Sequence, residues 1–429
     1  MRKKLRFIFS VYHYLLAFLG NILFGFPSRK KFILGVTGTK GKTSVLDLIS
    51  FILEKAGYKT ALISSEWIKI GNKKVKNLTD TTMPGRFFIQ RFLRKAVNQN
   101  CDFILIEVTS QGIIQHRHRF INWNAAMFLN LAPEHIEAHG GFEKYKQAKL
   151  KFFTYVKNLS TIKHPTSNIK HPTSNIQHPT SNIKHPHRLF FINQDDLNAK
   201  HFIEAVKNQN TKIVLFSKDK IPSFLLSGSS FIFPENIAAA RAFVKEVGIS
   251  DKLIKEAIEK FPGTPGRMEV IQKEPFMVII DYAHTPDSLK KAYQAIVNLR
   301  PEANGKLICL LGCAGGGRDK WKRPEMGKIA AKYCRQIILT NEDPYDESPF
   351  RILSDIKSGI PAKFPATNIY EILDRKKAIQ KTLSLAKPGD IVILTGKGSE
   401  SYIHINHKKI PWNESEIVKQ ELVKIISKP

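Results

Sequence analysis

The chain has 429 residues, of which 42% are hydrophobic and 24% are charged, a balance typical of a globular protein with two or three domains. Its formal net charge of +30, from 67 basic and 37 acidic residues, favours anionic partners such as nucleotides, nucleic acid or an anionic membrane surface. The four cysteines lack metal-ligand spacing and are too few for a disulfide scaffold, which excludes the disulfide-rich secreted class and fits a reducing cytosol.

The first segment, residues 7–26, reads FIFSVYHYLLAFLGNILFGF, carries no formal charge and has a strongly basic flank on each side. Its length could just span a bilayer, but a spanning helix would leave one basic flank outside the cell, and no signal-peptide cleavage site follows. Two interpretations stay open. The segment is either a helix lying in the inner leaflet of the plasma membrane, with its flanks on lipid headgroups, or a buried helix of the first domain.

The next segment, residues 36–44, reads VTGTKGKTS and follows an apolar run. Its glycines allow backbone N–H groups to turn toward one point, and such donors beside a lysine and a helix N-terminus suit a polyphosphate. Residues 44–57 have apolar residues at helical spacing and end on glycine. We therefore expect a phosphate loop in which Lys42 contacts the β- and γ-phosphates and Thr43 binds Mg²⁺. The alternative is a plain glycine-rich turn, because Val36 holds the place of the first glycine of the common pattern.

Short runs rich in Ile, Leu and Val alternate with helix-like stretches along the rest of the chain, as buried parallel strands and their connecting helices do. These runs are Phe32–Val36, Phe103–Val108, Met277–Ala283, Leu307–Gly312, Gln336–Thr340 and Asp390–Gly396. The pattern predicts an α/β protein with two sheets. A Pro/Gly cluster at 261–266 marks the boundary between them, so we expect segments 1–31, 32–264 and 265–429.

Residues 164–186 repeat the unit HPTSNIK with small variations. A proline in every unit forbids a helix, and the repeated histidines could bind a metal. We favour a solvent-exposed insertion over residues 163–186, because surface loops tolerate added length at little cost in stability.

Further motifs follow in order. Glu107 ends an apolar run in IEVTSQG, residues 130–140 read NLAPEHIEAHG, and Lys149 lies in the helical stretch FEKYKQAKLKFF. The later motifs are PGRME (265–269), DYAHTP (281–286), GCAGGGRDKWKRP (312–324), TNEDPYDESP (340–349) and GKGSE (396–400). From about residue 32 to the C-terminus, this ordered series resembles the Mur ligase family, and most closely its MurE-like members, the UDP-N-acetylmuramoyl-tripeptide synthetases of peptidoglycan assembly.

The resemblance implies a P-loop central ATPase domain with a parallel sheet, followed by a C-terminal Rossmann-like α/β domain that brings the incoming amino acid. It implies a cytoplasmic, ADP-forming ligase that uses ATP and Mg²⁺ to add an amino acid, with a diamino acid favoured, to a UDP-N-acetylmuramoyl-peptide-type acceptor. ATP would phosphorylate a carboxylate of the acceptor, and the amine would then displace phosphate from the acyl phosphate.

Family roles carry over to matching positions of this chain. The catalytic set is Lys42, Glu107, His135 and Lys149. The metal set is Thr43, Glu107, His135 and Lys149, with Lys149 carbamylated and so converted into an anion. The ATP-binding set is Gly38, Thr39, Lys40, Gly41, Lys42, Thr43, Ser44, Asn236, Arg267, Asp281, His284, Arg318 and Lys320. The substrate-binding set is Thr81, Thr82, Ser110, Glu342, Asp343, Tyr345, Glu347 and Glu400. Taken singly, Glu107, His135 and Lys149 could instead be a salt-bridge partner, a helix cap and a surface cation.

The sequence departs from the family at three places. Only about thirty residues precede the phosphate loop, where MurE enzymes carry a domain that holds the uridine nucleotide. Lys40 replaces the usual asparagine of the loop. Tyr345 stands where enzymes selecting diaminopimelate have an arginine that pairs with its distal carboxylate. Because acidic residues surround that position, we expect an amino acid with a free side-chain amine and no second carboxylate, L-lysine rather than diaminopimelate.

Other functions are compatible with parts of this pattern. Within the ligases, the alternatives are glutamate addition to a folate-like acceptor, as in folylpolyglutamate synthase, or amidation of a lipid-linked cell-wall precursor. A basic P-loop NTPase acting on nucleic acid is a different class, as is an inactive binding module, and the series Glu107, His135, Lys149 argues against both. We expect no nucleic-acid partner, and the oligomeric state stays open.

Overall fold

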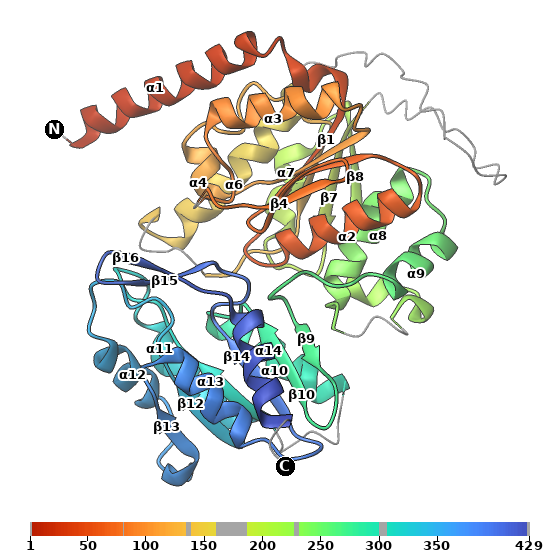
Figure 1. The fold of residues 1–429 in the computed structure, drawn as a ribbon. Helices are drawn as coiled ribbons and strands as arrows, with labels where there is room; N and C mark the ends of the chain where they lie inside the picture. Colours follow the sequence, from red (N-terminus) through yellow and green to blue (C-terminus); the bar gives the residue numbers. More distant parts are fainter. Residues whose placement is uncertain are drawn as a thin grey trace. The chain divides into compact units, whose positions relative to one another are not determined.

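The computed structural model describes residues 2–79, 81–133, 139–159, 187–226, 231–299 and 307–426. The chain divides into two compact units, residues 1–262 and 263–429. Each unit has its own sheet with helices packed against it (Figure 1). The repeat at 163–186 and the predicted ligand His135 lie outside the described residues.

The sheet of the first unit has eight strands in the order β4-β3-β2-β5-β1-β6-β7-β8. Six of them run parallel, while β3 and β4 extend one edge in antiparallel fashion. The strands are β1 Phe32–Thr37, β2 Thr60–Ile63, β3 Trp67–Ile70, β4 Lys73–Lys76, β5 Phe103–Glu107, β6 Ala125–Phe128, β7 Arg188–Asn193 and β8 Thr211–Phe216. The apolar runs predicted at Phe32 and Phe103 are therefore neighbouring central strands.

Helices cover both faces of this sheet, because alternate residues of a strand point to opposite sides. Leu34 and Val36 pack with α2, α8 and α9, whereas Ile33 packs with α3, α4, α6 and α7. The helices are α2 Lys42–Lys55, α3 Arg86–Asn98, α4 Ser110–Ile114, α6 Phe142–Lys157, α7 Ala199–Val206, α8 Pro234–Glu246 and α9 Asp251–Glu259, with short 3₁₀ turns η1 Pro27–Lys30, η2 Lys218–Lys220 and η3 Ser223–Leu225.

The apolar N-terminal segment forms helix α1, Arg2–Leu23, which packs beside α3 on the outside of the unit (Figure 1). The interpretation as a buried helix is wrong for most of its large side chains, which are exposed. No helix in the described part of the chain has the length and apolar character needed to cross a membrane.

The second unit has a six-stranded sheet in the order β13-β12-β11-β14-β10-β9, parallel except for β9, and a separate β15-β16 hairpin. The strands are β9 Glu269–Gln272, β10 Met277–Asp281, β11 Leu307–Leu311, β12 Gln336–Leu339, β13 Ile369–Glu371, β14 Ile391–Thr395, β15 Tyr402–Ile405 and β16 Lys408–Pro411. The helices are α10 Pro286–Leu299, α11 Lys322–Tyr333, α12 Pro349–Lys357, α13 Arg375–Ser384 and α14 Glu414–Ile426, with the turn η5 Ala366–Asn368. The motifs that begin at 281, 312, 340 and 396 start at or directly after the carboxyl ends of β10, β11, β12 and β14, where open α/β sheets place their ligand sites.

Candidate active site

The phosphate loop connects β1 to α2, and its shape depends on Gly41 and on an asparagine that sequence reasoning did not select. Gly41 has a φ of 85°, and a Cβ added there would lie 2.6 Å from Oδ1 of Asn236. Asn130, which follows β6, accepts hydrogen bonds from the backbone N–H groups of Thr39 (3.1 Å) and Lys40 (2.8 Å) through Oδ1. Its Nδ2 donates to the Lys40 carbonyl at 3.1 Å. The loop is therefore clamped in one conformation.

Two lysine side chains converge on this loop. Nζ of Lys42 donates to the Gly38 carbonyl at 3.0 Å, and Nζ of the buried Lys149 donates to the same oxygen at 2.8 Å. Lys42 also donates to the Thr39 carbonyl and lies 3.8 Å from Oε1 of Glu107. Two ammonium groups that share one carbonyl oxygen repel each other, and together they concentrate positive charge where a polyphosphate is expected.

A hydroxyl–carboxylate group lies beside these lysines. Oγ1 of Thr43 donates to Oε2 of the buried Glu107 at 2.8 Å and lies 2.7 Å from Oγ of Ser65. Ser65 donates two further hydrogen bonds to the same carboxylate oxygen, from its backbone N–H at 3.0 Å and from its Oγ at 3.2 Å. Oxygen donors of this kind suit a hard cation such as Mg²⁺. Ser65 was missed by sequence reasoning, although its place two residues after β2, beside the strand that ends in Glu107, was a usable signal.

The remaining predicted residues of the first unit lie in loops and at helix starts. Ser44 is in the first turn of α2. Thr81 and Thr82 belong to the loop before α3, where the Thr81 carbonyl accepts from Oγ1 of Thr79 at 3.0 Å. Ser110 begins α4, and its Oγ lies 3.0 Å from Nε2 of His139.

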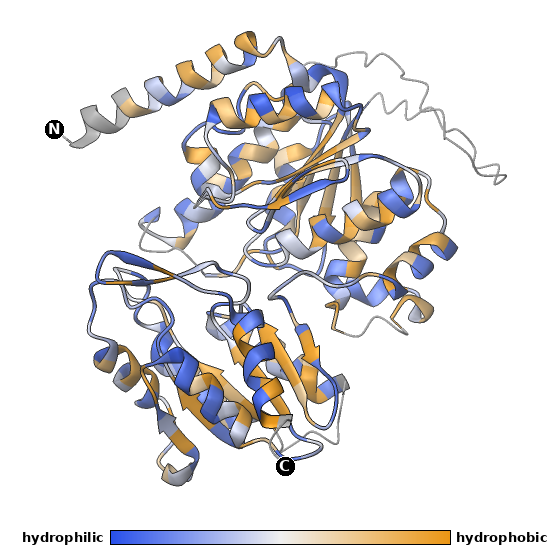
Figure 2. Cartoon of the chain, viewed as in Figure 1, coloured by the Kyte–Doolittle hydropathy of each residue, from blue (hydrophilic) through white to orange (hydrophobic). Residues whose placement is uncertain are grey.

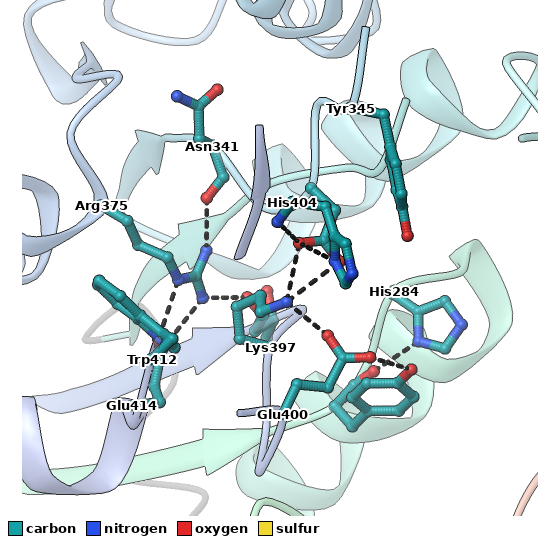
Figure 3. Close-up of polar contacts among 12 residues, drawn as sticks. His284, Asn341, Tyr345, Arg375, Lys397, Glu400, His404, Trp412 and Glu414 are labelled. Carbon is teal, nitrogen blue, oxygen red and sulfur yellow. Dashed lines mark hydrogen bonds and ion pairs between the residues drawn. The ribbon is translucent and has the colours of Figure 1, made fainter. Parts of the chain in front are cut away.

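In the second unit, a buried charge cluster joins the motifs that begin at 340 and 396 (Figure 3). Nζ of the buried Lys397 donates to both carboxylate oxygens of Asp343, at 3.0 and 3.1 Å, and to Oε2 of Glu400 at 2.6 Å. Tyr282 donates its hydroxyl to Oε1 of Glu400 at 2.8 Å. Burial lowers the pKa of Lys397, but the two carboxylates raise this pKa further, so its net pKa lies above the usual value. The lysine is an ammonium that offsets one of the two negative charges beside it.

Glu342 is the buried acid of this region whose charge is least compensated. It is 5% exposed, and its Oε2 has no hydrogen-bond partner among the described residues. Burial raises its pKa to about 7, against the opposing effect of Lys322. A Cβ added at Gly396, whose φ is 102°, would lie 2.6 Å from that oxygen, so glycine is needed there. A donor supplied by a ligand, such as an ammonium, would satisfy the carboxylate.

Tyr345 lies in a stack of three side chains. Its ring is 5.0 Å from that of His404, with an interplanar angle of 14° (Figure 3). Arg318 lies with Cζ 4.5 Å from the centre of the tyrosine ring, and its Nη2 donates to the tyrosine hydroxyl at 2.9 Å. A guanidinium therefore stands beside the position where diaminopimelate-selecting enzymes have an arginine.

The expectation of an acidic pocket open to an ammonium is wrong for three of its members. Asp343 and Glu400 both pair with Lys397, whose single positive charge they share. Glu347 pairs with the buried Arg323 at 2.8 Å and with Lys320 at 3.1 Å, and its hydrogen bond to Arg323 lowers its pKa to about 2. The partners of Asp343 and Glu347 are 24 or more residues away in the sequence, so charge counting along the motif could not find them, whereas Lys397 lies only three residues from Glu400.

The predicted nucleotide contacts of the second unit lie before β9, at the end of β10 and in the turn after it, and in the loop between β11 and α11. Asp281 accepts from the backbone N–H groups of Met268 and Ala283, both at 2.8 Å. Arg267 lies with its Cζ 4.0 Å from the centre of the Tyr282 ring. Nδ1 of His284 is 2.7 Å from the Tyr282 carbonyl, and Lys320 is engaged with Glu347 as described.

Arg375 was not selected from the sequence, yet it ties two strand ends of this region together (Figure 3). It donates to the carbonyls of Asn341, after β12, and Thr395, at the end of β14, at 3.0 and 2.8 Å. It also makes a buried bidentate pair with Glu414, at 3.0 and 2.6 Å. Trp412 donates to the same carboxylate at 2.6 Å.

Two family profiles match the chain. The Mur ligase middle domain matches residues 36–183, and the Mur ligase glutamate ligase domain matches residues 266–398. The curated relatives include UDP-N-acetylmuramoyl-L-alanyl-D-glutamate–2,6-diaminopimelate ligases. That of Aquifex aeolicus is 34% identical, over 93% of this chain and 79% of its own length. That of Thermosynechococcus vestitus is 33% identical, over 96% and 80%.

Solved structures agree with these matches. A structure of a UDP-N-acetylmuramoyl-L-alanyl-D-glutamate–2,6-diaminopimelate ligase superposes with a TM-score of 0.57 and 26% identity, over 92% of this chain and 79% of that one. A folylpolyglutamate synthase of Mycobacterium tuberculosis, complexed with ADP and AMPPCP, gives a TM-score of 0.64 at 14% identity, over 89% and 92%. The second likeness shows a shared fold.

Proposed function

This chain belongs to the Mur ligase family, and on that premise we propose which substrates it takes and which residues act on them. It is an ATP-dependent, ADP-forming amide ligase of peptidoglycan biosynthesis that adds an amino acid to a UDP-N-acetylmuramoyl-peptide-type acceptor. The observation that carries our proposal is the chemistry of its two units. One has a cationic phosphate loop beside a hydroxyl–carboxylate group, and the other has a buried carboxylate beside a charge cluster.

For the nucleotide, we propose that Lys42 and the phosphate loop hold the phosphates of ATP. Thr43 and Glu107, oriented by Ser65, would hold Mg²⁺, which supplies neutralisation of the phosphate charge. His135, Asn236 and the second-unit nucleotide contacts Arg267, Asp281, His284 and Lys320 stay predictions. Arg318, expected from the sequence to contact ATP, is proposed below to bind the amino acid instead.

We further propose that Lys149 is carbamylated in the working enzyme. The unmodified ammonium shares the Gly38 carbonyl with Lys42, so the two positive charges lie close together. A carbamate would replace this repulsion with attraction to Lys42 and would provide an anion for a metal ion. Burial of the side chain would protect the carbamate from exchange with water.

The reaction then has two steps. A carboxylate oxygen of the acceptor attacks the γ-phosphorus of ATP, an acyl–oxygen–phosphorus bond forms, and ADP leaves. The neutral amine of the incoming amino acid attacks the acyl carbon, phosphate leaves with the C–O bond pair, and the amine loses its proton. Glu342 is suited to bind the ammonium before this step and to accept a proton from it, because the pKa of its carboxyl is about 7.

We propose that the amino acid is 2,6-diaminopimelate, in place of the L-lysine expected from the sequence. The pairing of Asp343, Glu347 and Glu400 reduces the repulsion that a distal carboxylate would meet. Arg318, held on Tyr345, offers a guanidinium for that carboxylate. The acceptor would be UDP-N-acetylmuramoyl-L-alanyl-D-glutamate, as the names of the relatives state for those enzymes.

The test is phosphate release with a panel of acceptors and amino acids. Phosphate release only when both substrates are present supports the ligase. ATP hydrolysis at a rate that does not depend on acceptor or amino acid refutes this assignment of substrates. Competition between diaminopimelate and L-lysine at equal concentration then decides the amino acid. Arg318→Ala should raise KM for diaminopimelate at least tenfold while leaving that for L-lysine within about twofold, since a charged hydrogen bond contributes roughly 1.5–3 kcal/mol.

We propose a cytoplasmic location, because ATP and UDP-linked acceptors are cytoplasmic molecules. The basic, apolar first helix favours the inner face of the plasma membrane there.

A further inference from the structure

In an ordinary amphipathic helix the large apolar side chains face the protein, whereas in α1 most of them are exposed. The side that faces α3 carries small or polar residues, including Ala17, Gly20 and Asn21, all buried. A Cβ added at Gly20 would approach Gln90 and Phe87 of α3 at 3.5 and 3.7 Å, so the two helices pass closely. Burial of apolar surface therefore does not explain why this helix has so many large apolar residues.

Most of those residues are on the outer side, while Tyr14 and Phe18 lie at its edge, where their rings contact that of Phe120 at 5.0 and 5.3 Å. The large exposed side chains of α1 are Phe9, Val11, Tyr12, Tyr14, Leu15, Phe18, Leu19, Ile22 and Leu23, with exposures from 40% to 70%. Figure 2 shows the hydrophobic colouring recurring along the helix, on the outside of the unit. A contiguous exposed apolar surface of this kind marks an interaction site in a folded protein.

The helix is held in place, so its outer side is presented rather than free to turn inward. At its C-terminal end, Arg94 of α3 donates from Nε to the Phe24 carbonyl at 2.8 Å and from Nη2 to the Gly25 carbonyl at 2.7 Å. Farther toward the N-terminus, Oγ of Ser10 lies 2.8 Å from Nε2 of His116. The ring of Tyr14 meets that of Phe120 edge to face.

The charge around α1 has one sign. The sequence contains no Asp or Glu before Asp47, and α3 contains none either. Basic residues stand at both ends of α1 and along α3: Arg2, Lys3, Lys4, Arg6, Arg29, Lys30, Lys31, Arg86, Arg91, Arg94 and Lys95. Tyrosines on the exposed side suit an environment that is apolar at one depth and wet at another.

We propose that α1 is an interfacial membrane-binding helix, which deepens the proposed location at the inner face of the plasma membrane. It lies in the plane of an anionic bilayer, with its outer side between headgroups and acyl chains and its basic flanks on lipid phosphates. With 22 residues at about 1.5 Å each, it would place roughly 33 Å of helix along the surface. A second copy of this chain is the weaker occupant, because pairing two such helices would bring their all-basic surroundings together without a compensating acid.

The experiment uses the full chain and flotation with two kinds of vesicle, phosphatidylcholine alone and phosphatidylcholine with about a third phosphatidylglycerol. We expect binding to the anionic vesicles that weakens at least tenfold when salt is raised to about 0.5 M, since surface attraction is screened over a Debye length. The variant Tyr12→Ser/Leu15→Ser/Leu19→Ser should reduce the partition coefficient more than tenfold. The matched control is Phe350→Ser, which removes an exposed apolar side chain of α12 and should bind as the wild type does.

Several results would overturn the proposal. These are wild-type binding by the triple variant, loss of binding by the control, and a concentration-dependent dimer in light scattering that the triple variant abolishes while vesicles are not bound. Circular dichroism and phosphate release without vesicles should show that the triple variant is folded, because its substituted side chains are exposed. Vesicle binding without ligation would refute the substrates proposed above but would support the membrane-binding helix. Ligation without vesicle binding would support those substrates and refute the membrane-binding helix.

Discussion

Replacing Glu342 with glutamine should stabilise the protein at alkaline pH and impair use of the amino acid. The pKa of this buried carboxyl is raised from 4.5 to about 7 in the folded state. Between those values the folded protein binds more protons than the unfolded chain, so the stability contributed by this group is present below pH 4.5 and is lost as the pH rises through 7. Glutamine has no charge to bury, and so it avoids that loss.

The size of the effect follows from the shift. A difference of about 2.5 pKa units, at about 1.4 kcal/mol per unit, corresponds to roughly 3.5 kcal/mol over the whole titration. Between pH 5 and pH 8 the difference between Glu342→Gln and the wild type should therefore change by about 2.5 kcal/mol in favour of the variant. Loss of the anion that receives the ligand's ammonium should raise KM for the amino acid about tenfold or more, while KM for ATP changes little.

Urea unfolding at pH 5 and pH 8, with phosphate-release kinetics on the same preparations, measures both effects. Glu347→Gln is the matched control, because the pKa of Glu347 is lowered to about 2 by Arg323. Its contribution to stability is present above pH 4.5, so this variant should be destabilised to a similar degree at both pH values. The reasoning is refuted if Glu342→Gln is destabilised at pH 8, or if its difference from the wild type is the same at pH 5 and pH 8.

Three further predictions concern the other clusters. Lys42→Ala should lower ATP turnover at least tenfold without changing the melting temperature by more than a degree or two, as kinetics and calorimetry can show, because phosphate contacts are commonly worth several kcal/mol. Lys149→Ala should be inactive and partly restored by short carboxylates; full activity of the unsupplemented variant would contradict the carbamate. Arg375→Met should cost about 3–5 kcal/mol in urea unfolding by leaving Glu414 buried without its cationic partner, and adding Glu414→Leu should recover much of that loss.

The central strands of both sheets could be predicted because they are buried on both faces, and a short continuous run of Ile, Leu and Val between polar stretches is typical of such a strand. Helix α2 could be predicted from its spacing and its glycine boundary. Pairings between side chains could not. Lys397 pairs with Asp343, 54 residues away in the sequence, and Arg318 bonds to Tyr345, 27 residues away. The net charge around the amino-acid motif could therefore not be predicted from the residues of the motif alone.

The exposure of the apolar residues of α1 could not be predicted for a different reason. The sequence shows how apolar the segment is, but which side packs depends on where small residues allow a close approach, here at Gly20 against α3. Sequence reasoning assigns large apolar residues to a core unless another signal contradicts it, but most of those in this helix are exposed. Ser65 and Asn130 escaped notice for a simpler reason: single polar residues in loops carry no periodicity, and their importance arises only from the strand ends that the sheet brings together.

The asparagine clamp on the phosphate loop has a consequence for the thermodynamics of nucleotide capture. Asn130 fixes three consecutive peptide groups of the loop with three hydrogen bonds, all made within the protein itself. The conformational entropy of ordering these residues is therefore lost when the unit folds, and not when ATP arrives. Binding should consequently proceed with a small entropic penalty from the loop and with little change in its amide hydrogen exchange. The affinity for ATP should then depend mainly on the electrostatic attraction between its phosphates and the lysines of the loop.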